Sequence, residues 1–205
     1  LFISPASVVR FCQKLGFSGY SDFKASLRMD LFEPETAPRE TRPTDFFRDI
    51  QKTIQMVPEE TVERIVELIH RSRRIELYAV GSSRMPGTEL AKRLQTIGKA
   101  AFCYDDSTLM NISARQLTPD DLVLALSISG ETSLIIAAAT VAKSRGAALV
   151  SFTNLGSNTL SSMADENLYV NATNFVRSGI QVQSRVQLLM LCEYLFFRYI
   201  ETYGG

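Results

Sequence analysis

The sequence predicts an α/β fold, a five-stranded and mainly parallel sheet with helices on both faces, preceded by a partial helical segment. From residue 75 onward, short and nearly continuous apolar runs alternate with helical stretches. This alternation is typical of parallel strands that are covered on both faces. The 205 residues are 45% hydrophobic and 21% charged, the proportions of a globular protein rather than a disordered or fibrous one. A proline-rich segment separates this part from the N-terminal residues.

Two short helices are expected in the N-terminal segment, residues 1–32. The first begins at Ser4, a helix N-cap that is followed by proline, and its apolar stripe ends at Gly16. Residues 33–43 contain three prolines and five charged residues, so this stretch propagates no helix and is expected to be a linker. The remainder, residues 44–205, is expected to be one larger domain.

The elements of the larger domain follow from the spacing of its apolar residues. Spacings of three and four predict two leading helices, over residues 46–56 and 61–71. Apolar runs predict five strands, and the stretches between them predict further helices. The strands are expected at 75–80, 100–104, 122–127, 148–153 and 167–170, and the helices at 85–96, 133–143 and 182–203. The last helix is so rich in Leu, Met and Phe that we expect it to form a subunit interface, in a homodimer or higher oligomer.

Charge and composition exclude several classes of protein. The 22 Lys and Arg residues balance 22 Asp and Glu residues, so any DNA binding has to be local. Three widely spaced cysteines favour a reducing compartment, and a single histidine, His70, argues against a zinc cluster. No apolar run reaches the roughly 20 residues that span a bilayer, so we expect a cytoplasmic protein without a membrane partner. Because the chain begins with Leu1 rather than Met, we expect an N-terminal piece to be missing.

Two loops rich in hydroxyl groups and glycine follow the first and third predicted strands. In an open α/β sheet, ligands bind beyond the carboxyl ends of the strands, where loops lead into helix N-termini. Free backbone N–H groups, the helix dipole and short hydroxyl donors can hold a phosphate there without a lysine. The alternative is that these residues only cap helices, but two such loops in equivalent positions favour an anion site. The candidate residues are Ser82, Ser83, Ser127, Ser129, Gly130, Glu131 and Thr132.

Neither loop carries a nucleotide signature. The first loop, Gly81-Ser-Ser-Arg-Met-Pro-Gly87, matches neither the G-x-G-x-x-G pattern of dinucleotide folds nor the G-x-x-x-x-G-K-[ST] pattern of nucleoside-triphosphate sites. NAD and ATP are therefore not the first choices of ligand, and no cofactor and no metal is expected.

Two stretches resemble a known family. Ser127-Ile-Ser-Gly-Glu-Thr132 resembles the phosphosugar-binding signature of SIS (sugar isomerase) domains. Ile3-Ser-Pro-Ala-Ser-Val-Val-Arg-Phe-Cys-Gln-Lys-Leu-Gly16 and the residues up to Lys24 resemble the end of the helix-turn-helix domain of RpiR-type bacterial transcription regulators. The resemblance implies a sensor that binds a phosphosugar effector between SIS subunits and thereby changes the DNA affinity of its helix-turn-helix heads. By position, Ser82 and Ser83 match the first phosphate loop, and Ser127, Ser129 and Thr132 match the second.

The resemblance also implies an operator-binding surface in the intact N-terminal domain. Only the recognition helix and the helix after it are present in this chain. The first turns of a recognition helix enter the major groove, where Arg10 would meet a guanine edge or a phosphate, or remain a solvated surface residue. The candidate DNA contacts are Ser4, Ala6, Ser7, Arg10 and Lys14.

The competing class is a SIS enzyme that isomerises a sugar phosphate, which needs a positioned general base with a pKa near neutrality. Glu131 is the only carboxylate within the second loop, and it could instead shape the loop or pair with a cation. His70 precedes the first strand, at the wrong end of the sheet, and the adjacent Asp105 and Asp106 are more typical of solvated or helix-capping residues. No acid–base pair emerges, so the sequence predicts a regulator rather than an enzyme.

The segment 174–185 contains two further arginines, Arg177 and Arg185. C-terminal segments of SIS domains approach the ligand site of the same or the partner subunit. The resemblance therefore allows either arginine to meet a phosphate or a sugar acid, with a surface salt bridge as the alternative.

Overall fold

The computed structural model describes residue 9 and residues 41–177 and 180–204. Arg42–Phe175 and Ile180–Gly205 form one compact unit. Apart from Val9, the two helices expected in residues 1–32 lie outside the described residues, and so does most of the linker. So do the candidate DNA contacts Ser4, Ala6, Ser7, Arg10 and Lys14.

The larger domain is built on a five-stranded sheet with the strand order β2-β1-β3-β4-β5, in which every neighbouring pair is parallel. All five predicted strands are present, each within one residue of its expected ends, so the predicted fold class is confirmed. The strands are β1 (Arg74–Ala79), β2 (Ala101–Tyr104), β3 (Asp121–Leu126), β4 (Ala148–Asn154) and β5 (Glu166–Val170).

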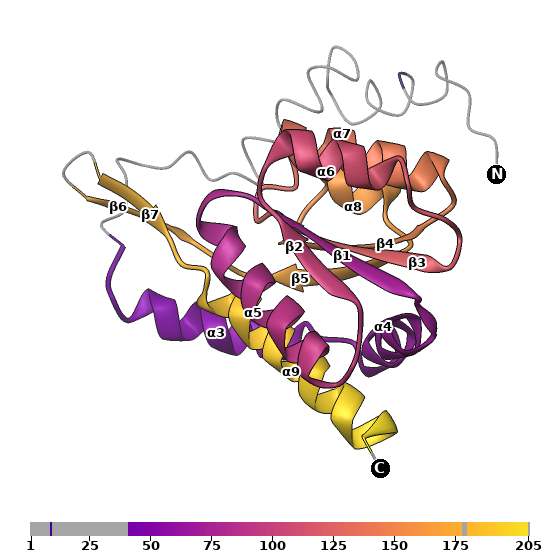
Figure 1. Cartoon of the computed structure of the whole chain (residues 1–205). Coiled ribbons are helices and arrows are strands. Elements are labelled where there is room, and N and C mark those ends of the chain that lie inside the picture. Colours follow the sequence, from indigo (N-terminus) through magenta and orange to yellow (C-terminus); the bar gives the residue numbers. More distant parts are fainter. Residues whose placement is uncertain (1–8, 10–40, 178–179, 205) are drawn as a thin grey trace. The chain divides into compact units, whose positions relative to one another are not determined.

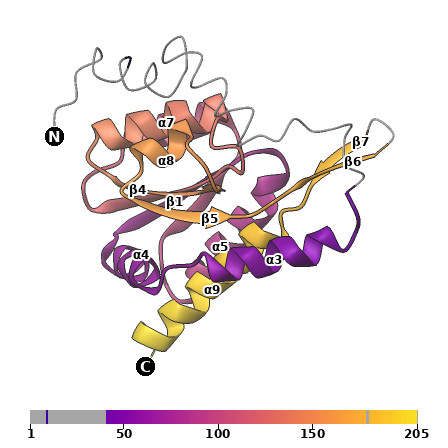
Figure 2. The same ribbon diagram turned by 180° about the vertical axis from the view of Figure 1, so that it is seen from behind.

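Helices cover both faces of the sheet, as Figures 1 and 2 show. One layer consists of α4 (Glu59–Arg71), α5 (Arg84–Thr96) and α9 (Val186–Tyr203), and the other of α6 (Ser107–Ala114), α7 (Ser133–Ser144) and α8 (Thr159–Met163). Successive residues of a strand point to opposite faces. Accordingly, Leu77 of β1 packs in the core with α4, α5 and α9, while its neighbour Tyr78 packs with α6, α7 and α8.

Helix α3 (Asp45–Gln55), the first described helix, is held by a buried carboxylate. Asp49 accepts hydrogen bonds from Asn171 Nδ2 at 2.6 Å and from the backbone N–H of Thr173 at 2.7 Å. Thr53, one turn later, accepts a hydrogen bond from the backbone N–H of Asn171 at 2.9 Å. These contacts fix α3 against the segment that leaves the last strand of the sheet.

The prediction of one helix over residues 182–203 was wrong at its start. Residues 180–183 belong to strand β7 (Ile180–Gln183), which pairs with β6 (Asn174–Arg177), and the helix α9 begins only at Val186. The sequence Ile-Gln-Val-Gln alternates apolar and polar residues, the period of a strand and not of a helix. None of the described helices is long and apolar enough to cross a membrane.

Two helices were not anticipated from the sequence, and both have a side-chain cap at their first turn. Asp106 accepts a hydrogen bond from the backbone N–H of Leu109 at 2.9 Å at the start of α6, the capping role considered for it above. Asn158 accepts one from the backbone N–H of Ser161 at 2.8 Å at the start of α8. Such caps satisfy N–H groups that have no partner within the helix.

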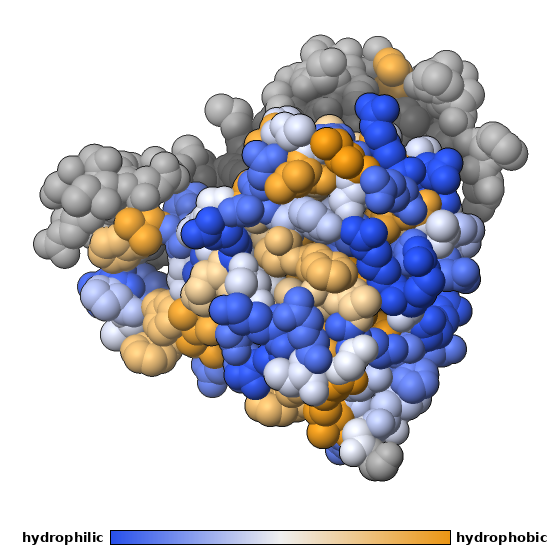
Figure 3. Space-filling model, in the orientation of Figure 1, coloured by the Kyte–Doolittle hydropathy of each residue, from blue (hydrophilic) through white to orange (hydrophobic). Residues whose placement is uncertain are grey.

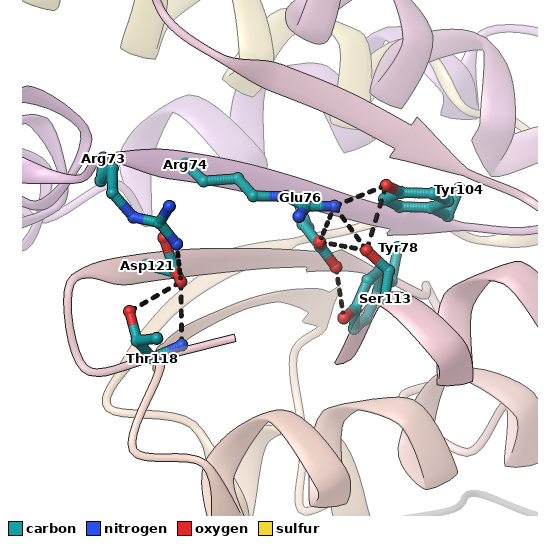
Figure 4. Close-up of polar contacts among 8 residues, drawn as sticks. All are labelled: Arg73, Arg74, Glu76, Tyr78, Tyr104, Ser113, Thr118 and Asp121. Carbon is teal, nitrogen blue, oxygen red and sulfur yellow. Dashed lines mark hydrogen bonds and ion pairs between the residues drawn. The ribbon is translucent and has the colours of Figure 1, made fainter. Parts of the chain in front are cut away.

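A buried carboxylate lies inside the sheet, surrounded by donors (Figure 4). Glu76 of β1 is fully buried, and its two carboxylate oxygens accept from Arg74 at 2.7 Å and from the Tyr78 hydroxyl at 2.7 Å. Ser113 of α6 also donates to this carboxylate, and Arg74 donates to the Tyr104 hydroxyl at 2.8 Å. Burial, with the adjacent carboxylate, raises the pKa of Tyr78 far above its usual range, so the phenol remains a neutral donor. A charge in this position is tolerated because it is paired and hydrogen-bonded.

Replacing this carboxylate should destabilise the domain. Glu76→Ala leaves Arg74 without its counter-ion and two buried hydroxyl groups without their acceptor, so we expect the free energy of unfolding to fall by about 3 kcal/mol. Urea unfolding of both proteins measures this difference. In the control, Glu89→Ala removes a partly exposed ion pair with Arg93 and should cost less than about 0.5 kcal/mol. Equal losses in the two variants would contradict the interpretation.

Candidate functional site

The two hydroxyl-rich loops leave the sheet from neighbouring strands. β1 and β3 pair in parallel with Ala79 opposite Leu126, so the residues that follow these two positions emerge at the same edge of the sheet. After β1 the chain forms a short 3₁₀ helix, Gly81–Ser83, that leads into α5. After β3 it forms the loop 127–132 that leads into α7. This is the carboxyl edge of the sheet, where ligands bind in open α/β folds.

The hydroxyl groups of the second loop converge. The Oγ of Ser127 lies 2.8 Å from Thr132 Oγ1 and 3.4 Å from Ser129 Oγ. The Ser129 hydroxyl also accepts a hydrogen bond from the backbone N–H of Glu131 at 3.2 Å. Thr132 occupies the N-cap position of α7 without capping the helix by its side chain. Because the first N–H groups of a helix have no intrahelical acceptor, three hydroxyl groups here adjoin backbone donors and the positive end of a helix dipole.

Gly130 lets this loop turn beside α8. Its φ is +65°, and a Cβ atom at this position would lie 2.1 Å from Oδ1 of Asn158. Its carbonyl oxygen accepts a hydrogen bond from the backbone N–H of Leu160 at 3.0 Å, while Asn158 also donates to Thr153 Oγ1 at 3.1 Å. Asn158 was not among the residues predicted from the sequence. In the sequence, Asn158 begins the pattern Asn-Thr-Leu-Ser, which is typical of a helix N-cap. This pattern predicts a helix cap and gives no indication of a contact with the second loop.

The carboxylate of Glu131 is engaged by the same helix. It accepts hydrogen bonds from the backbone N–H of Thr159 at 2.7 Å and from the Thr159 hydroxyl at 2.8 Å. These hydrogen bonds lower the pKa of Glu131 below its usual range. A general base for sugar isomerisation needs a shift in the opposite direction, toward neutrality. The geometry therefore gives Glu131 the role of joining the second loop to α8.

The two serines of the first loop differ in their surroundings. Ser82 is exposed, whereas Ser83 is buried and its Oγ accepts a hydrogen bond from Arg185 Nε at 3.2 Å. Burial lowers the pKa of Arg185. Of the two arginines noted in segment 174–185, Arg185 thus contacts the first loop, while the side chain of Arg177 lies outside the described part of the chain.

The other titratable candidates have structural partners. Asp105 forms an ion pair with Arg84 at 2.7 Å, and the guanidinium group holds the pKa of Asp105 below its usual range. His70 lies at the opposite edge of the sheet. Its Nδ1 lies 3.3 Å from the Tyr199 hydroxyl oxygen, and its ring is stacked on the ring of Tyr203. In the described residues, no three His, Cys, Asp or Glu side chains form a group that could hold a metal ion.

Two glycines with a positive φ provide a matched test of the second loop. Gly130→Ala combines an unfavourable backbone conformation with a clash against Asn158, so we expect a loss of about 3 kcal/mol in the free energy of unfolding. Gly81→Ala has a similar φ, +58°, but no atom lies within 4 Å of the added Cβ, and a loss of about 1 kcal/mol is expected. Urea unfolding measures both losses. A smaller loss for Gly130→Ala than for Gly81→Ala would show that the packing against α8 is not tight.

Comparison with known proteins gives two family matches. The SIS domain family matches residues 68–198, and the family described as helix-turn-helix domain, rpiR family, matches residues 1–34. Related proteins include YbbH of Bacillus subtilis, named an uncharacterized HTH-type transcriptional regulator, with 28% identity over 94% of this chain and 73% of that protein. The HTH-type transcriptional regulator RpiR of Escherichia coli is 26% identical over 96% of this chain and 71% of its own length.

Solved structures agree with this assignment. The NanR protein of Vibrio vulnificus, complexed with ManNAc-6P, is 34% identical to this chain over 97% of its length and 75% of that protein, with a TM-score of 0.72. The sugar isomerase domain of an RpiR transcription factor from Sphaerobacter thermophilus shares the fold, with a TM-score of 0.72 at 20% identity over 78% of this chain and 88% of that one. The chain therefore belongs to the RpiR family of helix-turn-helix transcription regulators with a SIS domain.

Proposed function

We propose that this regulator binds a phosphorylated sugar at the carboxyl edge of its SIS sheet and that the bound sugar alters operator binding by the N-terminal domain. The observation that carries the proposal is the convergence of the Ser127, Ser129 and Thr132 hydroxyl groups at the start of α7. The complex of V. vulnificus NanR with ManNAc-6P supports it, because nearly the whole length of this chain is related to that protein.

The chemistry of the edge favours a phosphate over a neutral ligand. A phosphate monoester carries up to two negative charges and several acceptor oxygens, and it needs donors above all. Hydroxyl groups and the free N–H groups at the start of α7 are donors, and the helix dipole adds positive potential. The neighbouring loop contributes Ser82 and Ser83, and Gly130 lets the second loop turn without a side chain of its own.

Binding without turnover agrees with the state of the nearby carboxylates. Glu131 and Asp105 both have lowered pKa values and are held by Thr159 and Arg84, so neither is poised to move a proton at neutral pH. Sugar isomerases are among the solved structures with this fold, for example phosphoheptose isomerase of Neisseria gonorrhoeae. At 17% identity, this similarity is evidence for a shared fold and not for a shared activity. A SIS enzyme is the alternative that the experiment below also tests.

Operator binding is assigned to the intact N-terminal domain. We place the end of this domain at residues 1–32, the linker at residues 33–43 and the SIS domain with its leading helices at residues 44–205. Within the N-terminal segment, the match to the rpiR-type helix-turn-helix family supports a recognition helix that enters the major groove. Its proposed DNA contacts are Ser4, Ala6, Ser7, Arg10 and Lys14.

Loss of one hydroxyl group should remove the response to the sugar. We expect the wild-type protein to be stabilised by one or more hexose 6-phosphates in a thermal-shift panel that includes ManNAc-6P, by about 2.7 kcal/mol at a hundredfold excess over the dissociation constant. Ser129→Ala should lose most of this stabilisation. Ser144→Ala, at the other end of α7, is the control and should retain it.

Two outcomes would contradict this proposal. A full response in Ser129→Ala would mean that the hydroxyl cluster does not bind the sugar. Turnover of a sugar phosphate that disappears in Glu131→Gln would identify the protein as an enzyme.

We also propose that the SIS domain forms at least a homodimer through α9. Apolar side chains remain exposed on this helix, and Figure 3 shows apolar patches in the lower part of the molecule, where Figure 1 draws α9. A groove along the helix is lined by Val186, Leu189, Met190, Glu193, Tyr194 and Phe197. Exposed apolar patches of this kind are typical of interfaces between subunits.

Light scattering tests the dimer. We expect a dimer or larger species at micromolar concentration, and Phe197→Glu should shift it toward the monomer, because Phe197 is 56% exposed and a charge there is costly to bury in an interface. A wild-type protein that is already monomeric at micromolar concentration would contradict the proposal.

A further inference from the structure

Arg185 is a partly buried cation without a carboxylate partner in the described part of the chain. Its Nε donates to Ser83 Oγ at 3.2 Å, and its Nη1 donates to the carbonyl oxygens of Gln183 at 2.7 Å and Ser184 at 3.4 Å. Arg84, at the start of α5 near the same edge, is instead paired with Asp105 at 2.7 Å. No carboxylate therefore neutralises the charge of Arg185 in the described part of the chain.

A cation in these surroundings favours an anionic ligand. Burial removes part of the hydration of the guanidinium group, and carbonyl oxygens and a hydroxyl group compensate only part of its charge. A phosphate would supply the missing negative charge, and the planar fork of an arginine matches two phosphate oxygens. One of the contact partners of Arg185 is Ser83 of the first loop, so the charge lies at the edge of the sheet where the hydroxyl groups are.

A second side chain at the start of α9 has unused hydrogen-bonding capacity. Gln187 is fully buried, and within the described residues neither its amide nitrogen nor its amide oxygen has a hydrogen-bond partner. Leaving a buried amide unpaired costs free energy, and such groups call for a specific explanation. Arg185 and Gln187 are separated by one residue, so a cation without an anionic partner and an unpaired buried amide both lie where α9 begins.

We propose that Arg185 binds the phosphate group of the effector and is the cation of a site whose other ligands are hydroxyl and backbone N–H groups. This inference rests on the proposed function. It adds to that function a residue far from both hydroxyl loops in the sequence, and it assigns the start of α9 to the site. It also predicts that the site selects phosphorylated sugars over neutral sugars by charge as well as by hydrogen bonding.

Calorimetric titration with two probes tests the inference. The probes are inorganic phosphate and the hexose 6-phosphate that binds wild-type protein most tightly in the panel above. In Arg185→Met, which removes the charge but keeps much of the length, we expect both affinities to fall at least tenfold. Arg185→Lys, which keeps the charge without the fork, should bind with intermediate affinity and serves if the Met variant does not fold.

A matched control lies on the same helix. Arg198 lies near the C-terminal end of α9 and forms an ion pair with Glu59 of α4. Arg198→Met should therefore leave both affinities within twofold of the wild-type values. Far-ultraviolet circular dichroism and urea unfolding establish that each variant is folded before its titration.

The possible outcomes separate this inference from the proposed function. If the wild-type protein binds no sugar phosphate, the proposed function is wrong and the inference falls with it. If Ser129→Ala loses binding while both Arg185 variants bind like wild type, the function stands and the inference is wrong. If only the sugar phosphate binds more weakly and inorganic phosphate does not, Arg185 contacts the sugar and the assignment to phosphate is overturned.

Discussion

The parallel pairing of β1 with β3 is the constraint on which the site depends. Because Ala79 lies opposite Leu126, the two strands end together, and the loops that follow them start side by side although they are separated by more than forty residues in the sequence. A shift of one residue in this register would turn every side chain of one strand to the opposite face and misplace its loop. Near-continuous burial of β1 and β3 between two helical layers fixes the register. The ion pair between Arg73, which precedes β1, and Asp121 of β3, at 3.0 Å, adds a polar contact between the starts of the two strands.

The second loop is held by α8 as well as by the sheet. Gly130 accepts a hydrogen bond from the first turns of α8, and Glu131 accepts two from Thr159. The hydroxyl groups of Ser127 and Thr132 are therefore held in place by contacts within the protein. A ligand that binds preformed donors spends less free energy on ordering them, which favours binding by a short loop without a lysine.

Local patterns explain what could be predicted from the sequence. Apolar runs and strand–loop–helix transitions are properties of neighbouring residues, so the five strands and the positions of both hydroxyl loops were predicted correctly. Helix capping was one of two alternatives left open for Asp106. The β6–β7 pair was missed because apolar residues continue from strand into helix around Val186, and the short helices α6 and α8 carry little periodic signal.

Contacts between distant residues could not be predicted in this way. Glu131 meets Thr159 28 positions later, and Arg185 meets Ser83 across 102 positions. Nothing local distinguishes Glu76 from an exposed strand residue. Its burial depends on Arg74 and Tyr78 from its own strand and on Ser113 from a helix that the sequence analysis did not anticipate.

The contacts of Arg185 also connect it with the segment that holds α3. Its guanidinium group holds the carbonyl oxygen of Gln183, and the side chain of Gln183 donates to the carbonyl oxygen of Ala172 at 2.8 Å. Ala172 lies between the two residues that Asp49 of α3 holds. An arginine that turns toward a phosphate has to rearrange its contacts with these carbonyl groups, and the segment that holds α3 is attached to them. Since α3 is the first helix after the expected linker, hydrogen bonds and short backbone segments together connect Arg185 with the start of the SIS domain.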